Sequence, residues 1–172
     1  AIDDVRIIAA NTDPVSIAAS LVPLTFCQGA FFNTDYSITG TFNAGNMFTA
    51  QLSDATGSFA SPTAIGMAMT TTGGSIACVI PPGTSPGIGY RIRVVSDSPV
   101  FTGTDNGTDI IVYEAPFAGM DGSLSACTGD DPVSLATGGD VGGTWTGPST
   151  VVNDQYDPAT MEPGTYTYTV FG

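Results

Sequence analysis

Residues 89–96 read GYRIRVVS, the clearest β-strand signal in the chain. Three apolar side chains, Tyr90, Ile92 and Val94, alternate there with Arg91 and Arg93. Successive side chains of a strand point to opposite faces of a sheet, so the alternation predicts that the apolar three face a core. The two arginines are then expected on the solvent face, as partners for some of the chain's carboxylates.

The rest of the chain repeats this kind of signal in short runs separated by turn residues. Runs of strand-forming residues recur at a spacing of roughly ten residues, which is typical of an antiparallel sandwich. No window of about eleven residues keeps a helical apolar period free of Gly, Pro or Thr clusters. The other strands that we expect in the first module are 16–20, 22–27, 34–41, 47–53, 64–70, 75–80 and 108–114.

A second, smaller module is predicted to follow a short linker. We expect an N-terminal arm at 1–13, a first sandwich at 14–114, the linker at 115–119 and the second module at 120–172. Trp145 is the expected core anchor of the second module, because one large aromatic can organise a small sheet. We expect this module to lack its last strand, since 164–170 leaves an edge to be paired. Its predicted strands are 123–127, 132–136, 142–146, 149–152 and 164–170.

Composition excludes several classes of function. The chain has 16 acidic and three basic residues, no histidine and a net charge of −13. Without histidine, no catalytic group with an imidazole base can form within the chain, and we expect no enzyme. The acidic charge disfavours nucleic acid and anionic lipid, and the apolar runs are too short to insert into a membrane. A Thr-rich, Lys-free acidic composition favours an extracellular or cell-surface location.

The three cysteines suggest two different roles. Cys27 and Cys78 both lie in strand-like runs of the first module. An extracellular setting favours a disulfide between them, which would close a loop of about 50 residues. The alternative is a pair of small buried thiols. Cys127 is left over, which suggests either a partner outside the chain or simple burial.

Acidic residues in the loops raise the alternative of a weak structural calcium site. Hard oxygen ligands of the kind calcium prefers cluster at Asp105 and Asp109, and again at Asp130 and Asp131. The Asp105–Asp109 segment lacks the residue order of an EF-hand loop. Asp and Asn more often stabilise turns, so calcium is left open and no other cofactor is expected.

Two glycan-directed alternatives were weighed against simpler structural interpretations. Asp154, Asp157 and Glu162 could supply paired carboxylates for hydrolysis of a glycan, but a solvated turn is the simpler interpretation. Several aromatic residues could form a platform that stacks on sugars. Because they alternate within strands, we expect them to pack in the core instead. They are Phe31, Phe32, Tyr36, Phe48 and Tyr90.

The N-terminal run 5–10, VRIIAA, is more apolar than is expected of a segment that is exposed to solvent. One interpretation is an extra edge strand on the first module. The other is that it adds as a strand to the open edge of a neighbouring subunit, which would build filaments. The residues that would meet in such an assembly are Val5, Ile7 and Ile8 on one side and Thr165, Tyr166, Thr167, Tyr168 and Val170 on the other.

Several longer phrases resemble repeats of large secreted surface proteins of Bacteroidetes, including gliding-associated adhesins exported by the type IX route. In the first module they are 41–62 (TFNAGNMFTAQLSDATGSFASP), 74–84 (GSIACVIPPGT) and 89–99 (GYRIRVVSDSP). In the second they are 118–135 (AGMDGSLSACTGDDPVSL), 142–149 (GGTWTGPS) and 156–170 (YDPATMEPGTYTYTV), which are similar to Ig-like or PKD-like modules. The resemblance implies surface adhesion or scaffolding with no catalytic site. In such modules a cysteine like Cys127 is usually followed by a later cysteine and a final strand, and neither follows here.

Together these observations predict an all-β chain of two tandem Ig-like antiparallel β-sandwich modules. The expected function is structural, as a segment of a surface adhesin or a subunit of an extracellular fibre that associates with itself or with tandem modules. The alternative is a carbohydrate-binding module of a secreted protein, with a glycan or another surface ligand. Solvent-exposed aromatic residues on one sheet face would distinguish that alternative.

Overall fold

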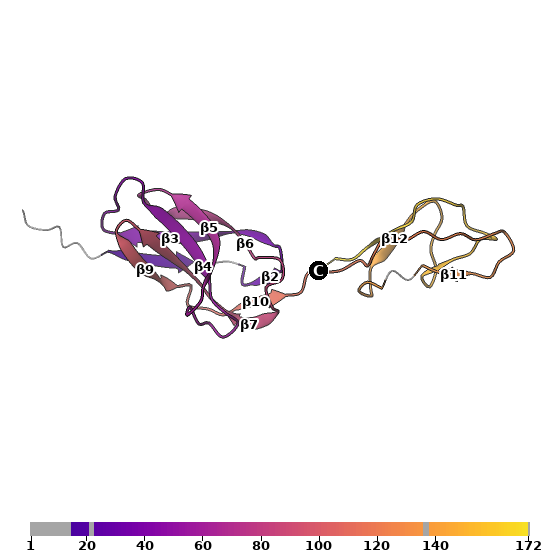
Figure 1. Ribbon diagram of the computed structural model, residues 1–172, viewed down its shortest axis with the longest axis horizontal. Coiled ribbons are helices and arrows are strands. Elements are labelled where there is room, and N and C mark those ends of the chain that lie inside the picture. The colour runs from indigo at the N-terminus through magenta and orange to yellow at the C-terminus, as the bar shows by residue number, and fades with distance from the viewer. Residues whose placement is uncertain (1–14, 21–22, 136–137, 172) are drawn as a thin grey trace, which may run out of the picture. The chain divides into compact units, whose positions relative to one another are not determined.

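The computed structural model describes residues 15–20, 23–135 and 138–171. The chain divides into two compact units, residues 1–114 and residues 115–172. All regular elements of the described residues are strands, which confirms the all-β prediction. Unit 1 contains β1 (Ser16–Ser20), β2 (Thr25–Cys27), β3 (Phe31–Thr39), β4 (Met47–Leu52), β5 (Thr63–Met69), β6 (Gly74–Val79), β7 (Gly87–Tyr90), β8 (Ile92–Asp97), β9 (Val100–Asp105) and β10 (Ile110–Tyr113) (Figure 1).

Seven of these strands form one sheet that folds back on itself. Its order is β5-β4-β8-β9-β1-β3-β6, and all neighbours are antiparallel except β1 and β9. The first and last strands of this order, β5 and β6, lie in contact. A Cβ on Gly66 of β5 would lie 2.3 Å from the carbonyl oxygen of Ala77 in β6. Only glycine therefore permits this approach of the two backbones.

Folding back places the two halves of the sheet face to face around one apolar core, in a β-sandwich-like arrangement. Tyr36 of β3 and Phe48 of β4 meet across the interior with ring centroids 4.8 Å apart. Tyr90, Ile92 and Val94 are buried as predicted, while Arg91 and Arg93 are partly exposed. The remaining buried apolar residues are Ile17, Phe26, Phe42, Ala50, Leu52, Ile65, Ile76, Cys78, Ile80, Ile110 and Val112.

A three-stranded sheet, β2-β10-β7, contributes to the same core. Ile110 and Val112 of β10 are fully buried, and Phe26 of β2 packs on Phe32 with ring centroids 4.4 Å apart. The predicted strand 89–96 is therefore divided at Arg91. Its first part, β7, pairs with β10, and its second part, β8, pairs with β4 and β9.

The buried side-chain amide of Asn46 links three segments of unit 1 that lie at strand ends. Asn46, fully buried before β4, donates from Nδ2 to the Thr70 carbonyl oxygen at 3.2 Å and accepts at Oδ1 from the Ser98 backbone N–H at 2.9 Å. These partners follow β5 and β8 respectively. A buried amide is stable only when its polar atoms are paired, so Asn46 fixes these chain segments relative to one another.

The sequence patterns located most strands of unit 1 and missed one. The predicted strands 16–20, 47–53, 64–70, 75–80 and 108–114 correspond to β1, β4, β5, β6 and β10, with shifts of a few residues at most ends. β9 was not predicted, because Gly103 interrupts its pattern. A Cβ on Gly103 would lie 2.6 Å from the Val94 carbonyl oxygen and 2.7 Å from that of Ile17. The glycine thus serves close packing between strands.

Unit 2 contains much less regular structure (Figure 1). Its strands are β11 (Val133–Ser134), β12 (Thr144–Thr146), β13 (Gln155–Tyr156) and β14 (Thr167–Thr169). They form two separate pairs, β11-β13 and β12-β14, both antiparallel. The predicted strands 123–127 and 149–152 were wrong, because 123–127 contains no strand or bridge and 149–152 makes only the isolated bridge of Val152 with Gln155.

The close approach at Gly66 gives the first prediction. Replacing Gly66 with alanine should lower the free energy of unfolding of unit 1 by about 1–3 kcal/mol, because the added methyl group meets backbone that cannot rotate away. Gly74→Ala is the matched control, since nothing lies within 4 Å of its Cβ position. Urea unfolding followed by far-UV circular dichroism measures both variants. Equal stabilities of the two variants would contradict the proposed constraint.

Candidate functional site

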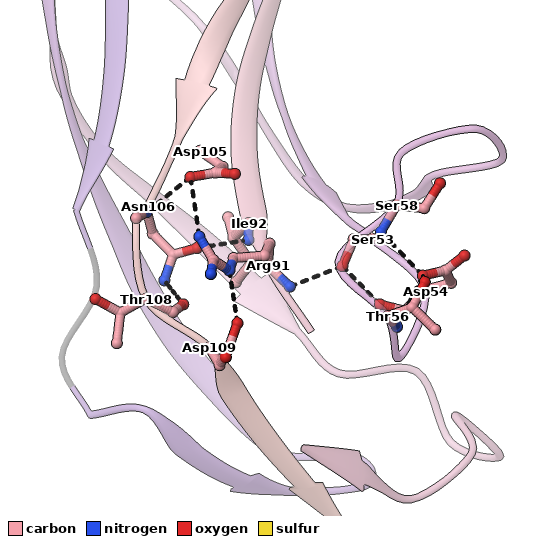
Figure 2. A network of polar contacts seen from close by, with 11 residues as sticks. Ser53, Asp54, Thr56, Ser58, Arg91, Ile92, Asp105, Asn106, Thr108 and Asp109 are labelled. Atoms are coloured by element: carbon pink, nitrogen blue, oxygen red, sulfur yellow. Dashed lines mark hydrogen bonds and ion pairs between the residues drawn. The ribbon is translucent and has the colours of Figure 1, made fainter. Parts of the chain in front are cut away.

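A polar network of unit 1 surrounds Arg91, between β7 and β8 (Figure 2). Arg91 Nε donates to Asp109 Oδ1 at 2.8 Å, and Arg91 Nη1 lies 3.6 Å from Asp105 Oδ1. The hydrogen bond to Asp109 is the main reason that the pKa of Arg91 is raised, and both negative charges add to it. The arginine thus ties the β9–β10 connection to the β7–β8 junction.

The loop that carries these carboxylates is itself fixed by Asn106 (Figure 2). Asn106 Oδ1 accepts from the Ile92 backbone N–H at 2.9 Å, and its Nδ2 donates to the Thr108 carbonyl oxygen at 2.7 Å. Asp105 Oδ1 also accepts from the Gly107 N–H at 2.8 Å. The side chains of Asp105, Asn106 and Asp109 therefore all have partners within this network.

A second loop, 53–58, is organised by one carboxylate. Asp54 Oδ1 accepts from the Thr56 hydroxyl at 2.7 Å and from the backbone N–H groups of Thr56 and Ser58, both at 2.9 Å. These hydrogen bonds, led by that from the Thr56 hydroxyl, lower the pKa of Asp54. Ser53 links this loop to the Arg91 network, because its Oγ accepts from the Arg91 backbone N–H at 2.7 Å.

A shallow pocket of about 350 Å³ lies beside the Asp54 loop. Tyr90 is part of its lining, and burial followed by the negative charge of Asp54 raises the pKa of Tyr90. Because the hydroxyls of Ser53, Thr84 and Tyr90 already donate to backbone carbonyl oxygens, the polar part of the lining is better suited to accept hydrogen bonds from a hydroxylated molecule. It consists of Ser53, Asp54, Ser61, Thr63, Thr84, Ser85 and the Tyr90 ring with its hydroxyl.

The predicted calcium ligands do not form one cluster. Asp105 and Asp109 lie together around the guanidinium of Arg91, while Asp130 Oδ2 accepts from the backbone N–H of Cys127 at 2.8 Å. Asp131 is exposed. Within 15–20, 23–135 and 138–171, no group of three or more metal-ligating side chains is placed to hold an ion. Weak calcium binding stays a prediction.

The predicted disulfide between Cys27 and Cys78 is not formed, because all three cysteines are free thiols. Cys78 lies in the core, where its Sγ is 3.4 Å from the Ile76 carbonyl oxygen and 3.7 Å from Thr34 Oγ1. Burial raises the pKa of the Cys78 thiol, which keeps it protonated and unreactive. Cys27 lies on β2, a strand of the other sheet, and Cys127 is exposed in unit 2.

The three carboxylates considered for glycan hydrolysis lie in unit 2, and two of them accept hydrogen bonds within it. Asp154 Oδ1 accepts from the Trp145 indole N–H at 2.8 Å, and Asp157 accepts from the Ala159 backbone N–H and the Thr160 hydroxyl, both at 2.9 Å. Glu162 is exposed on the same unit. Both aspartates therefore hold local structure.

The proposed sugar platform of unit 1 is mostly core, as expected. Tyr36, Phe48 and Tyr90 are buried, and Phe32 packs partly buried against them. Phe31 is the exception, because 87% of it is exposed on the outer side of β3.

Arg93 was expected to pair with a carboxylate, but its neighbours are an amide and an aromatic ring. Its Nε donates to Gln51 Oε1 at 2.9 Å and its guanidinium lies 4.3 Å from the Phe59 ring centroid.

The aromatic residues of unit 2 gather on one face of the β12-β14 pair. Trp145 and Tyr168 are opposed across the pair, with ring centroids 5.0 Å apart. Tyr166 lies on the same face, two residues from Tyr168. A Cβ on Gly143 would meet the Tyr168 ring at 2.5 Å, and one on Gly147 would meet the Tyr166 ring at 2.3 Å. The tyrosine rings thus cover the glycines that flank Trp145.

This packing leaves the apolar surface of unit 2 largely uncovered. Trp145 is only partly buried, and every large apolar side chain among the described residues of the unit stays at least partly exposed to solvent. The exposed ones are Phe117, Met120, Leu124, Val141, Val152 and Phe171. Unit 1, by contrast, has a fully buried core.

The residues expected in strand assembly are only partly described. Thr167 and Tyr168 lie in β14, with Thr165, Tyr166 and Val170 beside it. Val5, Ile7 and Ile8 lie outside the described residues. β14 pairs with β12 on one side.

No family model matches the chain, and no curated protein matches it. Among the residues that the structure describes, no helix is long and apolar enough to cross a membrane.

The hydrogen bonds to Asp54 predict a specific pH dependence. Because its pKa is lowered on folding, its stabilising contribution is complete above the pKa of the unfolded chain, about 3.9, and is lost as the pH falls through the folded value. Asp54→Asn should therefore unfold at a lower urea concentration than the natural chain at pH 6, and the difference should shrink toward pH 2. Thr56→Val should show a smaller deficit of the same kind. A deficit that is constant from pH 6 to pH 2 would contradict this role.

Proposed function

We propose that the protein is a non-enzymatic structural component of the bacterial cell exterior, a subunit or segment of an extracellular fibre or surface adhesin. Its two units are interpreted as tandem Ig-like modules. The observation that carries the proposal is the contrast between the units. Unit 1 buries sixteen apolar residues, whereas the described large apolar side chains of unit 2 stay partly or fully exposed.

Uncovered apolar surface on a secreted module is typical of an interaction site. The open β12-β14 pair adds to this, because an unpaired strand edge is a template for another strand. Assembly by strand addition between subunits accounts for both features. The resemblance to secreted surface repeats of Bacteroidetes favours the same location and role.

The carboxylates of the chain also favour a structural role. The three best-placed pairs of polar groups, around Arg91, Asp54 and Trp145, stabilise loops by hydrogen bonds. Together with the lack of histidine in the sequence, these hydrogen bonds support a structural role for the carboxylates rather than acid–base catalysis.

Fibre formation is the test of this proposal. Negative-stain electron microscopy of the purified chain should reveal regular fibres. If exposed Cys127 joins subunits, reductant and Cys127→Ser should each shorten these fibres, and Cys78→Ala, at a buried thiol, is the control. Dispersed monomers at all concentrations would refute a self-assembling subunit.

A carbohydrate-binding module is the second candidate, favoured by the hydroxyl-lined pocket beside Asp54 and Tyr90. In this case the chain should bind a polysaccharide in affinity electrophoresis. Thr63→Val, at the pocket, should then weaken binding about tenfold, since a lost hydrogen bond with a polar group left unpaired costs about 1–3 kcal/mol. Thr39→Val, on the exposed face of β3, is the control. Equal binding by both variants would exclude the pocket.

A further inference from the structure

We first consider whether the outer strands of the large sheet of unit 1 could accept a strand from another subunit. In the large sheet of unit 1 the two outer strands, β5 and β6, contact each other, and Gly66 allows their backbones to meet closely. A strand added there would have to separate them. This makes the outer strands of the large sheet poor acceptors.

β14 in unit 2 is a better acceptor. Residues 165–170, TYTYTV, form the longest run of strand-forming residues in the unit, whereas β12 is bounded by Gly143 and Gly147. Among the described residues, no backbone hydrogen bond outside the β12 pairing involves this run. No strand of the described chain pairs with this run on its side away from β12.

The two faces of β14 offer different surroundings. Tyr166 and Tyr168 lie on the face that also carries Trp145, and Thr167 and Thr169 lie on the opposite face. An added strand would bury apolar side chains beside the aromatic face and place the alternate ones beside the threonines. Such a strand needs apolar residues at every second position.

Residues 5–10 of the sequence have this pattern. Val5, Ile7 and Ala9 would share one face, and Arg6 and Ile8 the other. The run carries one positive charge, that of Arg6, and Asp3 and Asp4 come directly before it. Unit 2 has seven carboxylates and no basic residue: Asp121, Asp130, Asp131, Asp140, Asp154, Asp157 and Glu162.

We propose that residues 5–10 of a second copy of this chain add as a strand to the free edge of β14. This inference rests on the proposed function as a self-assembling fibre and names the partner and the surface. Because donor and acceptor are different parts of the chain, each copy can accept one neighbour and donate to another. A contact of this kind does not close, so it propagates as a filament.

Photo-cross-linking locates the donor without requiring a known register. The photoreactive residue p-benzoylphenylalanine is placed at Ile7, and fibres are grown from a mixture of isotopically heavy and light chains. Mass spectrometry should find cross-links between chains to residues 163–171. The same probe at Phe31, an exposed position on β3, is the control and should not label that segment.

A matched pair of charge variants measures the energetic contribution. Ile7→Asp should raise the critical concentration for assembly about tenfold or more, because it places a carboxylate against an apolar and acidic surface. Ile88→Asp makes the same change at an exposed position of β7 and should leave it unchanged.

The outcomes separate this inference from the function on which it rests. If no fibres form under any condition, the fibre proposal fails. If fibres form but Ile7 cross-links elsewhere on a neighbour or only within its own chain, the assignment to β14 is overturned and the fibre proposal survives. Equal critical concentrations for the Ile7→Asp and Ile88→Asp variants would also overturn it.

Discussion

The close approach of β5 and β6 is the constraint on which the architecture of unit 1 depends. This sheet encloses a core because its outer strands come together, and Gly66 lacks the Cβ that would clash with the Ala77 carbonyl oxygen of β6. With the sheet folded back, Tyr36 and Phe48 meet across the interior and the alternating apolar residues of β4 and β8 become fully buried. Asn46 then links the segments that follow β5 and β8, where an apolar residue could not pair with the backbone.

The polar networks of unit 1 follow from this frame. Because β7 and β8 belong to different sheets, the chain passes from one to the other at Arg91, and its side chain meets the connection between β9 and β10. In a chain with sixteen acidic and three basic residues, most carboxylates have no cation to pair with. Asp54 instead accepts hydrogen bonds from the backbone N–H groups of Thr56 and Ser58 in its own loop, which stabilise its charge without a cationic side chain.

Unit 2 uses similar strand-forming residues to a different end. Its tyrosine rings lie over Gly143 and Gly147, so the aromatic surface covers backbone and not a second layer of side chains. One sheet face packed in this manner leaves little surface fully removed from water, and small units of this kind gain stability from additional strands or partners. Among the described residues, the unit keeps exposed apolar side chains and pairs β14 only with β12. This links the proposed role in fibre assembly to a property of the fold itself.

The all-β class and the inward side of several strands follow from local alternation, as Tyr90, Ile92 and Val94 illustrate, because the two-residue period of a strand is written into neighbouring positions. Alternation did not predict β9, because Gly103 interrupts the apolar pattern of this strand. Glycine is needed there because the backbones at Ile17 and Val94 pass close to it. Alternation also failed to divide 89–96 between two sheets. Composition correctly suggested that Cys78 could be a small buried thiol, but it could not choose between that and a disulfide with Cys27. Which carboxylates surround Arg91, which strands close the sheet and which edge stays open were decided only by tertiary structure, because each depends on residues that are distant in sequence and meet only when the chain folds.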